Sequence, residues 1–564
     1  MRAEANTVLL IRADASTAIG TGHVMRCLAL TQAWLRTGGS AWLLQAESLD
    51  SLTTRVAAAG ILTATIAAIV GSEADAQATI AQARAIGAKW VVADGYRFGA
   101  AWQRAVRAAG LRVMLLDDCG HAPEYAPDVL LNQNLGADLT SYPKRDAATR
   151  FLLGARFALL REEFQMMRGS VREVPERARK ILITLGGSDP DNVTGQVLNE
   201  LLIRPETEIA VVVGGGNPHL DTLRAMIGAD RPAVRLIVNA TNMPELMAWA
   251  DVAVSAAGST AWELAFMGLP AVLIVVADNQ AGIAAALAAQ GISEHLGDHQ
   301  LLPPGRIAAA VDAVCAAVGR RREMSERGRA LIDGHGARRV GAVLGAALKL
   351  TIVSDATSWM NTYLPALKAD FEQAGHTVAW IHDPAKLVEG DLAFFLSLSR
   401  IVPEATLGRH AHNLVVHESA VPSGRGWSPL TWQVLEGKNE IPVTLLEAAA
   451  EVDSGEVLAQ TVIRLRGNEL VDELRSAQAN ATFAVCREFV ARYPFSLADA
   501  RPQRGEPSHY PRRRPADSRL DPDRSLREQF NLLRVADPER YPAYFELAGR
   551  RYEVRVAARE ANSA

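Results

Sequence analysis

The chain has 564 residues, of which 49% are hydrophobic and 22% are charged, and its formal net charge is −4 at pH 7. With about 100–200 residues per domain, this length predicts three to five domains of a soluble globular protein. The small negative charge argues against general binding to nucleic acids. The longest apolar runs, such as Leu269–Ala277, are far shorter than the roughly 20 residues that span a bilayer. We therefore expect neither a nucleic-acid nor a membrane partner.

The cysteines indicate a cellular compartment. Cys27, Cys119, Cys315 and Cys486 are isolated and form no CxxC pair, which fits a reducing environment and gives no zinc signature. The N-terminus passes almost at once into a predicted strand, without the apolar core and small-residue cleavage site of a signal peptide. We expect a cytoplasmic protein.

Up to about residue 345, short apolar runs alternate with Ala-rich amphipathic stretches. Continuous apolar strands followed by helices indicate parallel sheets that are covered on both faces. A first series of predicted strands lies at 8–14, 40–46, 89–96, 112–118 and 128–134. After a charged linker, a second series lies at 180–192, 208–216, 235–240, 251–260 and 270–280. We predict two doubly wound Rossmann-like domains, over residues 1–170 and 178–346, with a cleft between them.

A third series of predicted strands lies at 348–359, 376–383, 391–402 and 412–419. It predicts another Rossmann-like α/β domain over residues 348–495. The extension over 496–564 changes character: residues 508–525, rich in Pro, Arg and Asp, are expected to form an extended loop. Within the same extension we predict a helix over 526–535 and a strand over 550–558.

Four turns stand at predicted strand ends, where open α/β sheets bind their ligands. They contain Gly20, Gly22 and His23; Tyr96; Gly186, Gly187 and Ser188; and Gly258, Ser259 and Thr260. At the last turn, donors at a helix start suit a pyrophosphate, and Glu263 on that helix suits the ribose hydroxyls. Each turn also has a purely structural interpretation. Single glycines in such turns usually allow a positive φ, and a glutamate in the first turn of a helix interacts favourably with the helix dipole. Four turns at one sheet edge favour a nucleotide-sugar cleft.

Residues 7–345 contain, in order, the segments RADASTAIGTGHVMRCLALTQAW, DGYRFG, LLDDCGHAPEYAPDVLLNQN, ITLGGSDPDNVT and AAGSTAWELAFMGLPAVLIVVADNQ. These motifs resemble the nucleotide-sugar hydrolases of pseudaminic acid biosynthesis. The resemblance implies a glycosyltransferase-B-like fold similar to that of MurG. It also implies that water attacks the anomeric carbon of UDP-2,4-diacetamido-2,4,6-trideoxy-β-L-altrose with inversion, releasing UDP without a metal.

The resemblance makes His23 the general base. Imidazole exchanges protons near neutral pH, so a histidine on a rigid turn can deprotonate water beside the sugar. Donors at Gly258–Thr260 would take the charge that develops on UDP. Tyr96 and Asn279 match family positions that line the sugar site, and Asp14 is expected to orient the sugar or the imidazole. Two alternatives are a solvent-facing His23 beside a helix N-cap and a true glycosyltransferase of the same fold.

We expect no metal in this part of the chain. Asp117 and Asp118 resemble a DxD motif only weakly, and adjacent residues of a strand point to opposite faces. His121 and His219 follow turns, where exposed histidines are commonplace.

The segment His412–Gln460 contains the motifs HES…P…G and VDSG around SPLTWQVLEGKNEIPVTL. It resembles the core of the formyltransferase family, which includes methionyl-tRNA formyltransferase and sugar N-formyltransferases. The resemblance implies that His417 is the catalytic imidazole, Asp453 the catalytic aspartate and N10-formyltetrahydrofolate the formyl donor. An imidazolium held by a carboxylate can stabilise the tetrahedral oxyanion of formyl transfer.

One position departs from that family. Val415 stands where the family usually carries an asparagine, and Asn413 is displaced from it by two residues. Losing such an oxyanion donor can cost roughly 10²–10³ in rate, so a non-catalytic binding module is the alternative interpretation. A sugar amine is the expected acceptor, since the chain is not basic enough for tRNA. Arg512–Arg514 are a candidate contact for an anionic nucleotide-sugar, or a solvated face. The oligomeric state is left open.

Overall fold

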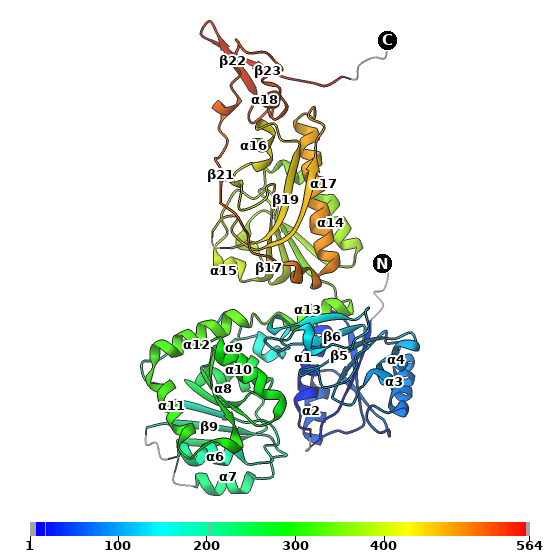
Figure 1. Cartoon of the computed structure of the whole chain (residues 1–564), viewed down its shortest axis with the longest axis vertical. Coiled ribbons are helices and arrows are strands. Elements are labelled where there is room, and N and C mark those ends of the chain that lie inside the picture. Colours follow the sequence, from blue (N-terminus) through cyan, green and yellow to red (C-terminus); the bar gives the residue numbers. More distant parts are fainter. Residues whose placement is uncertain are drawn as a thin grey trace. The chain divides into compact units, whose positions relative to one another are not determined.

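The computed structural model describes residues 7–16, 19–170, 172–202, 206–228, 231, 233–449 and 451–559. The chain forms two compact units, Met1–Ala346 and Ala347–Ala564. Both have an α/β architecture in which helices cover twisted sheets (Figure 1), as the sequence predicts. Residue 171, within the predicted linker over 168–179, lies outside the described residues.

The first sheet of the N-terminal unit has seven strands in the order β3-β2-β1-β4-β5-β6-β7, and every neighbouring pair is parallel. The strands are β1 (Val8–Ala13), β2 (Ser40–Gln45), β3 (Leu62–Thr65), β4 (Trp90–Asp94), β5 (Arg112–Leu116), β6 (Val129–Asn132) and β7 (Arg150–Leu153). The accompanying helices are α1 (Gly22–Leu35), α2 (Asp50–Ala58), α3 (Glu73–Ile86), α4 (Ala100–Ala108) and α5 (Glu162–Gln165). All five residues of β4 are buried, as expected for a parallel strand covered on both faces.

The second sheet of this unit has six parallel strands in the order β10-β9-β8-β11-β12-β13. The strands are β8 (Lys180–Thr184), β9 (Glu208–Val213), β10 (Val234–Val238), β11 (Val252–Ala256), β12 (Ala271–Val275) and β13 (Ser293–Asp298). The helices are α6 (Val193–Leu201), α7 (Leu220–Ile227), α8 (Met243–Trp249), α9 (Thr260–Met267), α10 (Ala281–Ala289), α11 (Arg306–Ala316), α12 (Val318–Leu331) and α13 (Gly336–Leu344). Strand order reverses between β1 and β4 in the first sheet and between β8 and β11 in the second. Such reversals open a crevice at the carboxyl ends of the strands.

The last helix of this unit returns to the first sheet. Helix α13 follows the second sheet in sequence, yet it packs against α1 and against the short 3-10 helix Ala155–Phe157. The approach is close at Gly336, where an added Cβ would lie 2.2 Å from the Ala158 carbonyl oxygen. A residue without a side chain is therefore required there.

The C-terminal unit contains a six-stranded mixed sheet in the order β15-β14-β16-β17-β19-β20. Its strands are β14 (Lys349–Val353), β15 (Thr377–Ile381), β16 (Gly390–Phe395), β17 (His410–His417), β19 (Glu440–Glu447) and β20 (Val457–Arg464). The first four are parallel, whereas β19 runs antiparallel to both β17 and β20. The helices that accompany the sheet are α14 (Leu364–Gln373), α15 (Glu404–Leu407), α16 (Pro429–Leu435) and α17 (Val471–Arg492).

The C-terminal extension is more structured than its composition indicates. Strand β21 (His509–Tyr510), within the predicted loop, pairs with β18 (Arg425–Gly426). The predicted helix over 526–535 is shortened to α18 (Phe530–Arg534), and residues 526–529 form turns, although Ser525 and Glu528 bond each other's backbone N–H as in a helix capping box. Strand β23 (Arg550–Val554) lies within the predicted strand and forms a hairpin with β22 (Ala543–Leu547).

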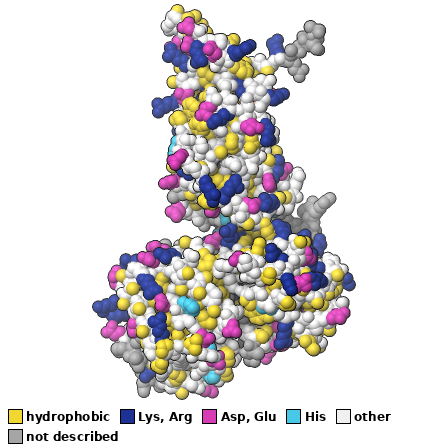
Figure 2. Space-filling view, in the orientation of Figure 1, with side chains coloured by type: hydrophobic (Ala, Val, Ile, Leu, Met, Phe, Trp, Pro, Cys, Tyr) yellow, Lys and Arg dark blue, Asp and Glu magenta, His cyan; other side chains and the backbone are white. Residues whose placement is uncertain are grey.

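The distribution of surface charge and the hydropathy of the helices are relevant to nucleic-acid and membrane partners. On the face drawn in Figure 2, basic and acidic side chains are interspersed with apolar ones over both units. Within the described part of the chain, no helix is both long and apolar enough to cross a membrane.

Candidate active sites

The strand order of the first sheet places His23 beside Asp94. His23 lies in the first turn of α1, which follows β1, and Asp94 ends the adjacent strand β4. The His23 Nδ1 atom is 2.6 Å from Asp94 Oδ1. One turn further along α1, Arg26 donates from Nε to Asp94 Oδ2 (2.5 Å) and from Nη2 to Oδ1 (2.6 Å). A buried carboxylate therefore bridges an imidazole and a guanidinium.

This arrangement keeps Asp94 ionised. Burial alone would raise the pKa of the Asp94 carboxyl, but the charges of Arg26 and His23 lower it to about 2. An ionised carboxylate only accepts hydrogen bonds, so His23 Nδ1 carries the hydrogen at 2.6 Å from Asp94. Arg26 Nη2, 3.2 Å from the same Nδ1, only donates and is therefore a contact without a hydrogen bond. In the neutral imidazole, Nε2 then holds the lone pair, and it has no hydrogen-bond partner among the described residues. The pair has the polarity that a general base requires.

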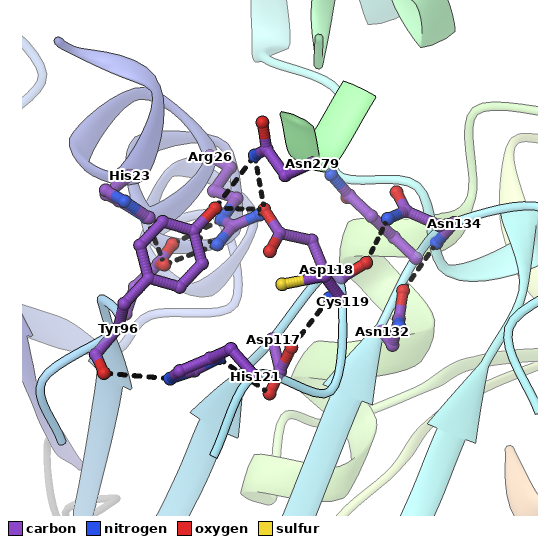
Figure 3. Close-up of polar contacts among 12 residues, drawn as sticks. His23, Arg26, Tyr96, Asp117, Asp118, Cys119, His121, Asn132, Asn134 and Asn279 are labelled. Atoms are coloured by element: carbon purple, nitrogen blue, oxygen red, sulfur yellow. Dashed lines mark hydrogen bonds and ion pairs between the residues drawn. The ribbon is translucent and has the colours of Figure 1, made fainter. Parts of the chain in front are cut away.

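Tyr96 and Asn279 join the two sheets at this point (Figure 3). The Tyr96 hydroxyl donates to Asp118 Oδ2 (3.0 Å), and Asn279 Nδ2 donates to the Tyr96 hydroxyl oxygen (2.8 Å). Asn279 lies in the 3-10 helix Asp278–Gln280 that follows β12, so this bond crosses from the second sheet to the first. The Tyr96 ring stands edge-on to His23, with centroids 5.2 Å apart. Burial, reinforced by Asp118, raises the pKa of the Tyr96 hydroxyl, which therefore stays protonated.

The predicted glycine turns also come together. An added Cβ on Gly187 would lie 3.3 Å from Thr21 Oγ1, so the turn of Gly186–Ser188 faces the turn of Gly20–Gly22. Both Gly20 and Gly186 have a positive φ, +74° and +101°. Gly258 lies beside Gln280, whose Nε2 would be 3.7 Å from an added Cβ. Ser259 and Thr260 stand at the start of α9, which has no side-chain cap bond.

Two predicted ligand-binding residues already have protein partners. Asp14 Oδ1 accepts the N–H groups of Ala46 (2.7 Å) and Glu47 (3.0 Å), while Oδ2 accepts from Arg12 Nη1 (2.7 Å). Asp14 thus fixes the loop after β2, and Asp94, which the sequence analysis did not single out, orients the imidazole instead. Glu263 Oε1 accepts from Arg161 Nη2 at 2.7 Å, so any ribose contact has to coexist with this ion pair.

Arg26 was also missed by the sequence analysis, although a signal existed, and Asp118 was considered there only as a weak metal-binding motif with Asp117. Arg26 follows His23 by three residues on a predicted helix, the spacing that places side chains on one face. Arg26 Nη1 donates to Asp118 Oδ2 at 3.3 Å, which links the two carboxylates around the histidine.

In the C-terminal unit, His417 ends β17 and approaches Asp453 in the loop between β19 and β20. His417 Nδ1 is 3.4 Å from Asp453 Oδ2, and that same oxygen accepts the N–H of Gly426 at 3.0 Å. His417 Nε2 donates to the carbonyl oxygen of Gly424 at 2.8 Å. Both ring nitrogens therefore face protein atoms. Asp453 has a φ of +55°, a conformation that orients this tight loop.

A cavity of about 600 Å³ opens beside this pair. Its wall includes His417, Asp453 and Val415, so the valine occupies the cavity wall where the family carries an amide. Asn413 cannot replace that amide, because its Nδ2 donates to the Leu407 carbonyl oxygen (2.9 Å) and the residue does not line the cavity. Glu418 also lines the cavity, and burial raises the pKa of its carboxyl despite the adjacent His417.

The extension contributes to the same cavity. Arg512 and Arg513 line it together with Asp537 and Tyr541. Arg513 is buried and donates to Ser518 Oγ (3.0 Å) and to the Val535 carbonyl oxygen (3.2 Å). Arg512 lies over the Trp427 ring at 5.0 Å. Within the predicted Arg512–Arg514 patch, Arg513 thus holds the wall together and is no part of a solvated face.

Comparisons with known proteins agree with this division. Residues 181–332 match the family described as Glycosyltransferase family 28 C-terminal domain, and residues 350–486 match the family described as Formyl transferase. Two domains that match different enzyme families are joined in this chain.

Individual relatives match parts of the chain. It is 28% identical over 235 residues to the spore coat polysaccharide biosynthesis protein SpsG of Bacillus subtilis, covering 41% of this chain and 68% of SpsG. It is 26% identical over 146 residues to methionyl-tRNA formyltransferase of Streptococcus gordonii, covering 25% of this chain and 46% of that protein. The chain thus spans less than half of that relative. The structure of Acinetobacter baumannii MurG is similar over 60% of this chain and 99% of MurG, with 15% identity and a TM-score of 0.42.

Proposed function

We propose that the N-terminal unit is a UDP-sugar hydrolase that releases UDP from UDP-2,4-diacetamido-2,4,6-trideoxy-β-L-altrose, in a cytoplasmic pathway to pseudaminic acid. The observation that carries this proposal is the His23–Asp94 pair, with a lone pair on Nε2, beside Tyr96 and Asn279. The match to a glycosyltransferase family supports a nucleotide-sugar substrate. The motif resemblance over residues 7–345 supports hydrolysis and the particular sugar.

In this mechanism Asp94 holds the Nδ1 hydrogen, and His23 Nε2 removes a proton from water. The water oxygen forms a bond to the anomeric carbon while the bond to the UDP oxygen breaks on the opposite face, which inverts the configuration. Tyr96 and Asn279 position the sugar, and the donors of Gly258–Thr260 receive the charge on the departing UDP. The residues of this chain supply each of these roles without a metal.

The test is UDP release from that UDP-sugar, with no acceptor present. We expect His23→Asn to lower the rate by about 10²–10⁴-fold, the usual contribution of a general base. His219→Asn, at a half-buried histidine that precedes α7 in the same unit, is the matched control. Unchanged release in His23→Asn would contradict the proposal, and release that begins only when an acceptor sugar is added would favour a glycosyltransferase.

Isotope labelling identifies the bond that breaks. In ¹⁸O water, attack at the anomeric carbon puts the label in the free sugar and leaves UDP unlabelled. Label in UDP would show attack at phosphorus and would exclude the proposed mechanism.

We further propose that the C-terminal unit transfers a formyl group to a sugar amine. The formyl transferase match, the His417–Asp453 pair and the adjoining cavity support this activity. The cavity has the size of small-molecule sites, and its apolar and charged walls suit a folate. N10-formyltetrahydrofolate supplies the formyl group when bound. Asp453 and the Gly424 carbonyl oxygen fix the imidazole of His417 from both sides, and the ring orients the reacting carbonyl and amine.

Mass spectrometry of a panel of UDP-amino sugars tests this second activity. We expect a folate-dependent formyl increment that is lost in His417→Asn and retained in His376→Asn, a histidine that bonds the Leu348 N–H. The occupation of both His417 ring nitrogens, together with Val415, favours the alternative of a binding module. Folate binding without any formyl increment would support that alternative.

A further inference from the structure

The loop that follows β5 collects three side chains with the chemistry of metal ligands. A carboxylate oxygen of Asp117, Sγ of Cys119 and a ring nitrogen of His121 all lie within 4.8 Å of one another. Figure 3 shows them beside Tyr96, with the carboxylate and the imidazole facing each other. The proposed hydrolysis assigns no role to any of the three.

The two ring nitrogens of His121 have different partners, and the one that would bind a metal faces Asp117. His121 Nε2 is 2.8 Å from the Tyr96 carbonyl oxygen, and a carbonyl only accepts, so Nε2 carries the hydrogen. Nδ1 then faces Asp117 Oδ2 at 3.3 Å. Histidines that bind metals usually donate their other N–H to a backbone carbonyl or a carboxylate, as this one does.

The carboxylate is fixed in the same direction. Asp117 is buried, and its Oδ1 accepts the N–H groups of Cys119 (2.8 Å) and Gly120 (2.9 Å), which leaves Oδ2 directed at the imidazole. Gly120 has a φ of +67°, and an added Cβ there would lie 2.5 Å from the Ser141 carbonyl oxygen. The turn that spaces the three side chains is therefore held by close backbone contact.

The separation of the imidazole nitrogen from the carboxylate oxygen fits a tetrahedral ion. Bonds of about 2.0–2.2 Å from zinc to nitrogen and oxygen place those two atoms roughly 3.3–3.5 Å apart. The distance between His121 Nδ1 and Asp117 Oδ2 is 3.3 Å. A Zn–S bond of about 2.3 Å requires the sulfur roughly 3.6 Å from each, so either separation exceeds the ideal one by at most about 1.2 Å, and a side-chain rotation of Cys119 has to close the difference. Cys119 and His121 are both exposed, which leaves room for that movement and for an ion to enter.

Against the expectation from sequence of no metal in this part of the chain, we propose that Asp117, Cys119 and His121 bind one divalent ion of the zinc class, with a fourth coordination position open to solvent. The His121 ring stands edge-on to Tyr96 with centroids 4.9 Å apart, so the ion would lie next to the residue that joins the two sheets. This site is independent of the hydrolytic mechanism, in which the chain's own residues perform each step.

Cobalt is a suitable probe because a Co²⁺–thiolate bond produces a strong near-ultraviolet charge-transfer band. The reduced, metal-free full chain is titrated with Co²⁺, and Zn²⁺ is then added in competition. We expect the band to saturate at one Co²⁺ per chain and to disappear when Zn²⁺ displaces it. Cys119→Ser should abolish the band, and His121→Ala should weaken Zn²⁺ binding at least about tenfold. Cys315→Ser, at the other cysteine that is not fully buried, is the matched control and should bind normally.

Three results would overturn the proposal: no charge-transfer band at equimolar Co²⁺, a band that persists in Cys119→Ser, or Zn²⁺ affinity unaffected by His121→Ala. Both substitutions are at exposed side chains, and circular dichroism reports whether each variant is folded. The readout is metal binding, so it stands whether or not the chain hydrolyses a UDP-sugar.

Discussion

The two histidine–aspartate pairs of this chain differ in what surrounds the imidazole. His23 uses Nδ1 for Asp94 at 2.6 Å and leaves Nε2 without a hydrogen-bond partner among the described residues. His417 is 3.4 Å from Asp453 on one side and donates to the Gly424 carbonyl oxygen on the other. The first arrangement is that of a proton acceptor, whereas the second holds a ring in place. A histidine beside an aspartate therefore implies general-base chemistry only when the second nitrogen is available.

The largest effect is expected from Asp94→Asn. An amide at this position can hold the wrong tautomer of His23 and removes the charge that stabilises the imidazolium, so kcat for UDP release should fall by about 10³–10⁴-fold. The measurement is steady-state UDP release, with circular dichroism to confirm folding. Asp138→Asn, at an exposed acid of the same sheet domain, is the control. Asp94→Glu keeps the charge and should restore part of the rate. An Asp94→Asn enzyme as active as the parent would show that Asp94 does not support His23 as a general base.

Val415→Asn tests the second pair, His417 and Asp453. It places an amide on the cavity wall beside His417, where an oxyanion donor is worth roughly 10²–10³ in rate. We expect formyl transfer to rise by about 100-fold, measured as the folate-dependent mass increment per unit time. Val415→Ala opens the same space without an amide and should show no gain. Equal rates in the two variants would mean that another group already performs this role.

Acid should destabilise the first pair. The pKa of Asp94 is lowered from 3.8 to about 2, so its contribution to stability is complete above pH 4 and is lost as the pH falls through 2. This shift corresponds to about 2 kcal/mol in the free energy of unfolding. Urea unfolding of the full chain at pH 5 and pH 3, followed for the N-terminal unit, should show a smaller loss in Asp94→Asn than in the parent. An identical acid dependence would place the responsible carboxyl elsewhere.

The smallest effect concerns the contact between the sheets. Tyr96→Phe removes the hydroxyl that Asp118 and Asn279 share, and we expect kcat/KM for the UDP-sugar to fall about tenfold, which equals about 1.4 kcal/mol. Asn279→Ala should act through the same bond. The double variant should therefore lose less than the product of the two single losses, and strictly multiplicative losses would show that the contact does not matter in the complex.

The fold class could be predicted because its signal is local. Continuous apolar runs such as the one that becomes β4 belong to buried parallel strands in any arrangement. The partner of His23 could not be predicted in this way. Asp94 reaches the imidazole only because β4 lies next to β1, and that neighbour relation depends on the order of strands in the sheet. Asp14 is closer to His23 in sequence, but backbone N–H groups after β2 occupy its carboxylate.

The structure of the C-terminal extension could not be predicted for the same reason, because it depends on contacts set by the tertiary fold. Its arginines were assessed by composition, which cannot distinguish a solvated run from one that includes a wall residue. Arg513 is buried because Ser518 and the Val535 carbonyl oxygen accept from it, and both are fixed by the fold of the extension itself. Its predicted helix was too long at the N-terminal end: Ser525 and Glu528 form the reciprocal bonds of a capping box, yet residues 526–529 form turns and the helix begins only at Phe530.

The return of α13 to α1 has a consequence for dissecting this molecule. The domain around the first sheet is built from two separate stretches of chain. The second stretch is α13, which follows the whole second sheet in sequence and packs against α1, the helix that carries His23. A fragment that stops at residue 170 would be left with the α13-binding side of α1 exposed to water. Expression trials and domain swaps are therefore best cut near residue 346, where the boundary between the two compact units lies.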